Sequence, residues 1–446
     1  MNIAVMKTKA EQALFETFDA VAAKLPGSAA VKARRADAIG KFSALGLPHR
    51  RIEEWKYTDL RASLKEALPP AINDKTPLTV GELIVALGPL AHVDAYRVAF
   101  VNGQHRAELD DVSGASELEL ESLGKVLASA PEEVASRVAG KADSDGDAIA
   151  VLNAAFMTDG AIVRVADRAV LAKPLLIVFV RAGSAARSVA VRNVIEVGDG
   201  ATATIIEAHV VLPGATQDGQ VNALNEVSVG KGATLHHAKV AVDDGKGVHL
   251  SNWDVTLGAD ASYRGFQYSA GLGLARNQIN VVYAGEGGKL DLSGAYLARG
   301  GEHIDTTLIV DHAVPRCESR ELFKGVLDGH GRGVFQGKII VRPDAQKSDG
   351  KQMSQALMLS EDAEFDSKPE LEIFADDVVC GHGSTSAQLD PDLLFYCRSR
   401  GIPENEARAL MIESFIGEAL DKVEHAEIRA ALNSYATSWL AGSVRG

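Results

Sequence analysis

A repeating pattern of β-type segments punctuated by glycine, between residues 194 and 296, constrains the fold of this chain most. Each unit has an apolar run, a turn containing glycine or small residues, and a second alternating run. Aligned on Gly198, Gly230, Gly258 and Gly285, the units recur every 27 to 32 residues: VIEVGDGATATIIEAHVV, VSVGKGATLHHAKVAV, VTLGADASYRGFQYSA and VVYAGEGGKLDLSGAY. No helix of 10–15 residues fits between these strands, which excludes alternating βαβ units.

Repeats of this length cannot bury an apolar face alone and must stack on their neighbours. A parallel β-helix and an antiparallel sandwich both satisfy that requirement. The near-constant period without paired hairpin signals favours the β-helix, with rungs roughly 4.8 Å apart and inward Val, Ile and Leu. Glycine at the corners permits sharp bends. We therefore predict a mainly β protein, a right-handed parallel β-helix flanked by helical domains.

Helical periodicity flanks the repeats on both sides. We expect an N-terminal, mostly helical domain with a few strands over residues 1–155, the β-helix core over 156–385 and a C-terminal helical domain over 386–446. Within the first domain, Tyr96 to Gly103 predicts a strand and turn, and Glu117 to Val138 predicts a helix. The terminal domains are expected to cap the two open ends of the stack.

Composition excludes several classes of function. The 46 basic and 60 acidic residues give a net charge of −14, which argues against a nucleic-acid binder. No apolar run has the length of a membrane span, and no secretory signal is visible at the start. The three cysteines, Cys317, Cys380 and Cys397, are too few for a disulfide framework and fit a reducing cytoplasm.

The chain lacks the common signatures of catalysis. Each Gly-Lys pair, such as Gly288-Lys289 and Gly337-Lys338, lacks the Ser or Thr of a phosphate-binding loop, so any ATP hydrolysis would belong to another subunit. Four carboxylates could suggest a polysaccharide-cleaving β-helix enzyme: Asp349, Asp362, Asp376 and Asp377. Such enzymes are generally exported, so carboxylates at turns and strand ends are the stronger interpretation.

The segment DDVVCGHGSTSAQLDPDLLFYCRSRG contains the best candidate metal ligands. If it is a strand, Cys380 and His382 share a face and can reach one ligand. Two ligands do not complete a tetrahedral site, and Cys317 could add a third only if the fold brings it close. The structural alternative, a small buried cysteine and a hydrogen-bonded histidine, is favoured by spacing alone. His236 and His237 point to opposite faces of a strand and are not expected to form a joint site.

Helices are expected after the last β segment. Asp390 is a candidate N-cap with Pro391 at the first helical position, and Gly401 is a candidate C-terminal glycine. Cys397 within this helix is expected in the core. Further along, an apolar stripe of Ile428, Leu432, Tyr435 and Trp439 indicates core packing, with partner docking as the alternative.

Several motifs, in this order, carry a family resemblance: RIEEWKYTDL, HAVPRCESRELFKGVL, GVFQGKIIVRPDAQKSD and LEIFADDVVCGHGSTSAQLDPDLLFYCRSRGIPENEARALMI. The chain resembles the SufB/SufD family of iron–sulfur cluster assembly proteins, and the segment Trp55 to Thr58 favours the SufD branch. The likeness spans most of the chain and is strongest from about Gly301 onward. One departure is the segment KQMSQALMLS, where the family tends to have asparagines in what we expect to be a loop.

The resemblance implies a non-catalytic subunit that pairs with a SufB-like subunit and a SufC-like ATPase. Nascent clusters would form at the SufB–SufD interface, with His382 and Cys380 as the residues that match, and no cofactor would be bound stably. The C-terminal helices would contact the ATPase, for which we expect Phe395, Arg398, Arg400, Leu410 and Met411. For the isolated chain we also expect that it can form a homodimer. The alternatives to this function are a SufB-like scaffold paralogue and a stand-alone β-helix enzyme acting on carbohydrate.

Overall fold

The computed structural model describes residues 7–129, 146–243 and 246–443. Its helices, with 3-10 turns marked η, are α1 (Lys9–Val21), η1 (Ala22–Lys24), α2 (Ala29–Leu45), η2 (Glu53–Trp55), α3 (Leu60–Ser63), α4 (Val80–Leu87), η3 (Gly88–His92), η4 (Ala107–Leu109), α5 (Leu123–Ser129), α7 (Ala148–Phe156), α8 (Pro391–Ser399), α9 (Glu404–Leu420) and α10 (Ala426–Ser443). Its strands are β1 (Tyr96–Val101), β2 (Gln104–His105), β3 (Leu118–Ser122), β4 (Ala161–Val165), β5 (Leu175–Arg181), β6 (Arg187–Val197), β7 (Thr202–Val211), β8 (Gly219–Val229), β9 (Thr234–Val242), β10 (Val248–Leu257), β11 (Ser262–Ala270), β12 (Leu274–Tyr283), β13 (Lys289–Arg299), β14 (His303–His312), β15 (Glu318–Asp328), β16 (Arg332–Val341), β17 (Asp349–Met358), β18 (Glu364–Ile373) and β19 (Val379–Ala387).

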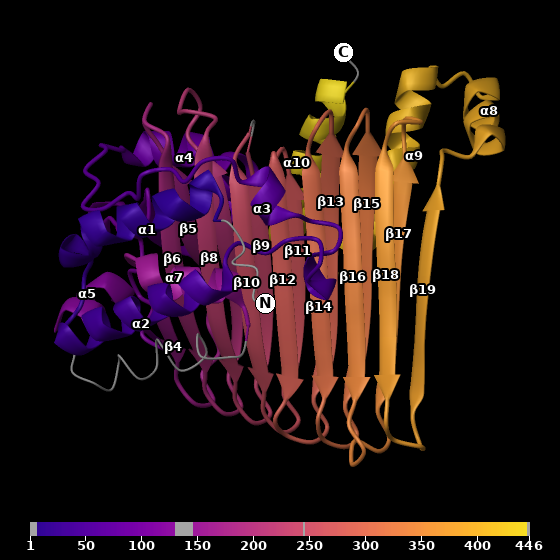
Figure 1. Cartoon of the computed structure of the whole chain (residues 1–446). Coiled ribbons are helices and arrows are strands. Elements are labelled where there is room, and N and C mark those ends of the chain that lie inside the picture. The colour runs from indigo at the N-terminus through magenta and orange to yellow at the C-terminus, as the bar shows by residue number, and fades with distance from the viewer. Residues whose placement is uncertain (1–6, 130–145, 244–245, 444–446) are drawn as a thin grey trace, which may run out of the picture.

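From β4 onward, consecutive strands alternate between two sheets that face each other. One sheet has the order β19-β17-β15-β13-β11-β9-β7-β5-β1-β2, and the other has the order β18-β16-β14-β12-β10-β8-β6-β4-β3. From β4 to β19 each strand pairs in parallel with the strand two positions away, so one turn contains two strands. Figure 1 shows the resulting stack of long, nearly parallel strands. The predicted parallel β-solenoid is confirmed, and the antiparallel sandwich is excluded.

The alternating sequence pattern places one set of side chains in the lumen, the space between the two sheets. Val227, Val255 and Val281 occupy equivalent inward positions on β8, β10 and β12 and are fully or almost fully buried. The aligned glycines lie at the turns, where the chain passes close to the preceding turn. A Cβ atom on Gly285 would lie 2.1 Å from the backbone nitrogen of Ala259, so only glycine fits there.

The N-terminal helices cover the outer face of the sheet that contains β6, β8, β10 and β12. Helices α1, α2 and α7 form a hydrophobic cluster that includes Leu250 and Leu274 of that sheet, and Figure 1 shows these helices in front of the strands. The segment around Trp55 is fixed to the solenoid by charge as well as packing. The guanidinium of Arg276 lies 3.9 Å from the centre of the Trp55 ring and 2.5 Å from a carboxylate oxygen of Asp305.

The C-terminal helices do not cap the stack, contrary to expectation. Helices α9 and α10 lie on the outer face of the other sheet, where Ile412 and Ile416 join a cluster with Val326 and Leu357. Within the described residues no further strand pairs with β18 or β19, which form the last turn and whose residues are mostly half-buried or exposed. At the opposite end, short antiparallel strands, β2 and β3, terminate the sheets.

Two local predictions need correction, and one is confirmed. Strand β1 and the turn after it confirm the prediction for Tyr96 to Gly103. The expected helix from Glu117 to Val138 begins instead as β3, followed by α5, and residues 130–138 of that prediction lie outside the described residues. The expected loop KQMSQALMLS is mostly strand β17. No helix among the described residues is both long and apolar enough to cross a bilayer.

Candidate functional site at the last turn

Strand β19 places Cys380 and His382 on the inner face of the last turn. Cys380 pairs in register with Gly350 and His382 with Gln352, and both partners on β17 are buried inward positions. Residues two apart on a strand share a face, so Cys380 and His382 both face the lumen, as the spacing predicts for a strand. His382 is exposed and Cys380 is half-buried, because no further turn follows within the described residues.

The other cysteines do not join this pair. Cys317 is fully buried two rungs away, with its thiol directed at the carbonyl oxygens of Pro315 and Gly285, at 3.5 and 3.7 Å. The described residues contain no group of three or more His, Cys, Asp or Glu side chains arranged to hold a metal ion. Burial raises the pKa of the Cys380 thiol, and the carboxylates of Asp349 and Glu321 add to this effect. At the last turn the described residues therefore supply one imidazole and one protonated thiol as potential ligands.

The helix after β19 is formed as predicted. The side chain of Asp390 accepts hydrogen bonds from the first-turn amides, Pro391 occupies the first helical position, and Gly401 follows the end with a φ of 84°. The expectation that Cys397 lies in the core is wrong, because it is half-buried and α8 has no buried residue. The helix packs on α9 but otherwise extends from the body (Figure 1).

The five residues predicted to contact a partner lie on or beside α8 and α9. Phe395 is 72% exposed and Leu410 is 52% exposed, which are high values for large apolar side chains. Arg398 and Arg400 are also exposed, whereas Met411 is half-buried. The later stripe is core packing: Ile428, Leu432 and Trp439 are buried, and the Tyr435 hydroxyl donates to the Leu87 carbonyl at 2.5 Å.

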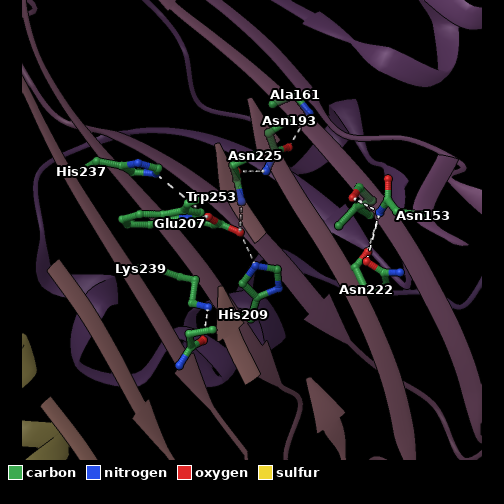
Figure 2. Close-up of polar contacts among 12 residues, drawn as sticks. Asn153, Ala161, Asn193, Glu207, His209, Asn222, Asn225, His237, Lys239 and Trp253 are labelled. Atoms are coloured by element: carbon green, nitrogen blue, oxygen red, sulfur yellow. Dashed lines mark hydrogen bonds and ion pairs between the residues drawn. The ribbon is translucent and has the colours of Figure 1, made fainter. Parts of the chain in front are cut away.

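A buried polar cluster lies deeper in the lumen and was not predicted from the sequence. Glu207 is fully buried, and its carboxylate contacts His209 at 2.5 Å, the Trp253 indole nitrogen at 3.2 Å and the Asn225 amide at 3.3 Å (Figure 2). Burial alone would raise the pKa of Glu207, but His209 and neighbouring bases outweigh it and lower the pKa to about 2. The carboxylate is therefore ionised and fully partnered.

Lys239 and His237 belong to the same cluster. The Lys239 ammonium donates to Asn277 at 2.6 Å, and burial lowers its pKa to about 8. Burial also lowers the pKa of His237 to about 4, so this ring is neutral near pH 7. His237 faces inward and His236 outward, as the alternation predicts. The alternating pattern in the repeats predicted that the two histidines face opposite sides of the strand. It did not show which side faces the lumen, because that depends on how the strands align with their neighbours.

Two of the four carboxylates considered for a carbohydrate-cleaving site form ion pairs, and the other two are exposed. Asp349 pairs with Arg320 at 2.7 Å, and Asp377 pairs with Lys347 at the turn before β19. Asp362 and Asp376 are exposed at turns. This arrangement favours the interpretation of turn and strand-end carboxylates.

Comparisons with known proteins match this chain to one protein family over most of its length. The family described as "SUF system FeS cluster assembly, SufBD core domain" matches residues 179–415, and "SufBD protein N-terminal region" matches residues 8–177. A SufBD family protein of Synechocystis is 30% identical, with 90% of this chain and 89% of that protein covered. SufD of Escherichia coli is 30% identical with 84% of each chain covered, and SufD of Bacillus subtilis is 26% identical with 63% of this chain and 64% of that protein covered.

The fold, its exposed last turn and these matches define a β-solenoid protein of the SUF iron–sulfur cluster assembly system. More specifically, the chain belongs to the SufBD family and is a homologue of SufD.

Proposed function

We propose that this chain is a non-catalytic subunit of a cytoplasmic cluster assembly complex. It pairs with a SufB-like subunit at the last turn of the solenoid and with a SufC-like ATPase at α8. The chain has no phosphate-binding loop, so ATP hydrolysis belongs to the ATPase. The nascent cluster is cargo, formed between the two large subunits and then transferred.

The open last turn is the observation that carries this proposal. Edge strands present unpaired backbone groups and are usually covered or blocked in stable monomers. Here β18 and β19 are both edges, and Ile373, Phe374 and Val379 beside them are exposed apolar side chains. A subunit of the same solenoid type can continue both sheets, which supports a SufB-like partner there and a homodimer when that partner is missing.

Covering this edge would also enclose Cys380 and His382. A neutral imidazole suits iron, and a thiolate binds it more strongly. Because the described residues offer only two such ligands at the last turn, the partner has to supply the others. That requirement supports cluster formation at the subunit interface.

Helix α8 is suited to an ATPase contact. It exposes Phe395 and Tyr396 on a helix that contacts the rest of the chain mainly through α9. Helix α9 is in turn attached to the solenoid, where the buried Lys324 of β15 pairs with Glu418. Movement of α8 by a closing ATPase can therefore reach the packed sheets through α9 and alter the last turn.

The test is cluster production by the assembled complex after His382→Ala. We expect cluster output to fall several-fold while the complex still forms, because the imidazole lies on an exposed strand and supports no core contact. His330→Ala, an exposed histidine at another turn, is the matched control and should leave output unchanged. Unchanged output with His382→Ala removes His382 from the proposed site.

The ATPase contact is best tested by point changes. Truncation after Asp390 would remove α9 and α10 and uncover the cluster that contains Ile416 and Leu432. Phe395→Asp with Leu410→Asp is expected to abolish co-purification of the ATPase and to leave the melting temperature within a few degrees. Retention of the ATPase by this double variant argues for another docking surface.

A further inference from the structure

The lumen just behind the last turn contains buried oxygen atoms without partners. Glu321 and Gln352 are each 3% exposed, and Ser354 is fully buried. Both carboxyl oxygens of Glu321, the amide oxygen of Gln352 and the hydroxyl of Ser354 have no hydrogen-bond partner. The nearby Ser319 hydroxyl contacts His312 at 3.1 Å and is also close enough to Glu321 to oppose the raised pKa of its carboxyl. Buried polar groups are nearly always satisfied, so four such atoms together call for a partner, either ordered water or a bound cation.

The strand register brings these side chains together. Glu321 pairs with Gln352, and Gln352 pairs with His382, so the three form one inward column on successive turns. Ser354 lies in the adjacent inward column, above Phe323. Phe323 and Phe335 contact each other across the lumen with ring centres 5.1 Å apart and form an apolar floor. The polar side chains therefore lie between this aromatic pair and His382 of the last turn.

A glycine on the facing sheet makes room for the glutamine amide. A Cβ atom on Gly337 of β16 would lie 2.2 Å from the amide oxygen of Gln352, and the Gln352 amide nitrogen approaches the Gly337 carbonyl at 3.4 Å. The amide thus spans the lumen between the sheets.

The inward positions of the last two turns, all within the described part of the chain, carry no lysine or arginine. Arg320 and Lys351 lie on the opposite face of their strands, and Arg320 is paired with Asp349. The Glu321 carboxyl therefore has no internal positive charge. Oxygen atoms from a carboxyl, an amide and a hydroxyl are the ligands that hard and borderline divalent cations accept.

We propose that Glu321, Gln352 and Ser354 form a binding site for one divalent cation of the Fe(II) or Mn(II) class, behind His382. The cation replaces the proton of the Glu321 carboxyl, which leaves to solvent, and water completes the coordination shell. A further role, holding iron before it reaches Cys380 and His382, rests on the proposed function. Cation binding itself does not, because all three ligands belong to this chain.

The test is titration of the metal-free, full-length chain with Mn²⁺, followed by electron paramagnetic resonance and calorimetry. We expect one saturable site in the wild-type chain and at least tenfold weaker binding after Glu321→Gln, which keeps the shape of the side chain. Glu318→Gln, an exposed carboxylate on the same strand, is the matched control and should bind as wild type.

Two further variants test the amide ligand independently of Glu321. Gln352→Met removes the amide oxygen, and Gly337→Ala displaces it. Both should weaken binding by several-fold. The site is refuted if the wild-type chain shows no saturable binding at millimolar Mn²⁺, or if Glu321→Gln binds as tightly as wild type. It is also refuted if the double variant Cys380→Ala, His382→Ala abolishes binding and none of the other variants does, because the cation would then lie at the last turn beside these two residues. None of these results depends on cluster output by the complex.

Discussion

Glu321→Gln in the metal-free chain should change how stability depends on pH. Burial raises the pKa of Glu321 from an ordinary 4.5 to about 8, against smaller opposing effects of Ser319 and Arg320. In the folded chain the carboxyl stays neutral up to about pH 8, whereas in the unfolded chain it ionises above about pH 4.5. As the pH rises from about 4.5 to about 8, the free energy of unfolding of the wild-type chain therefore falls, because only the unfolded chain can release this proton.

The size of this effect follows from the two pKa values. Each pH unit between them contributes about 1.36 kcal/mol, which amounts to about 5 kcal/mol by pH 8. Glutamine does not ionise, so the variant avoids the loss. We expect similar stabilities for the two proteins near pH 4.5, an advantage for the variant that grows with pH, and a plateau above about pH 8.

Denaturant unfolding in EDTA, measured at intervals from pH 5 to pH 9, tests this expectation. The difference in unfolding free energy between Glu321→Gln and wild type should rise across the whole interval below pH 8. Parallel pH profiles would contradict the reasoning, because they would mean that Glu321 is ionised and partnered in the folded chain. Glu318→Gln should show no such rise, since this side chain is exposed.

Three further changes test a close packing contact, a buried ion pair and a helix cap. Gly325→Ala would place a Cβ 2.2 Å from the Tyr296 ring and should cost about 1–3 kcal/mol of unfolding free energy, with relief when Tyr296→Ala is added. Asp305→Ala leaves the buried Arg276 without its carboxylate and should cost about 3–5 kcal/mol, measured by denaturant unfolding. Asp390→Ala removes the N-cap of α8 and should destabilise that helix by about 1 kcal/mol, seen as faster amide hydrogen exchange confined to α8.

Each of these has a contradicting result. Gly325→Ala without loss of stability would mean that the tyrosine ring moves freely. A small cost for Asp305→Ala would mean that water reaches the guanidinium. Unchanged exchange in α8 after Asp390→Ala would mean that contacts with α9, rather than the cap, hold the helix.

Local sequence patterns were sufficient to predict the solenoid and α8. The predictions that were wrong concern segments whose structure depends on contacts with residues far away in the sequence. Repeated glycine spacing indicates stacking, because such units cannot bury a face alone. The start of α8 is determined locally, because the Asp390 side chain accepts hydrogen bonds from the amides of Asp392 and Leu393. By contrast, Glu117 to Val138 has helical composition, yet its first residues pair with β4 as β3. Pairing with the distant strand β4 determines the structure of this segment, and the local sequence pattern carries no information about that pairing.

The candidate site shows the same division. Spacing predicted that Cys380 and His382 share a face, but their exposure depends on α9 packing against the side of the solenoid and leaving its end open. The alignment of Glu321 with Gln352 and His382 depends on the register of three strands spread over about sixty residues. Sequence alone gives no such register, so the buried oxygen atoms could not be predicted.

We propose that the open last turn is the surface at which this chain assembles with a second solenoid subunit. Hydrogen exchange of the chain, alone and after addition of a SufB-like partner, tests it most directly. We expect strong new protection of the amides of β18 and β19, because their free edges become paired, with little change in β6 to β12. A stable complex in which β18 and β19 exchange as fast as in the isolated chain would contradict it.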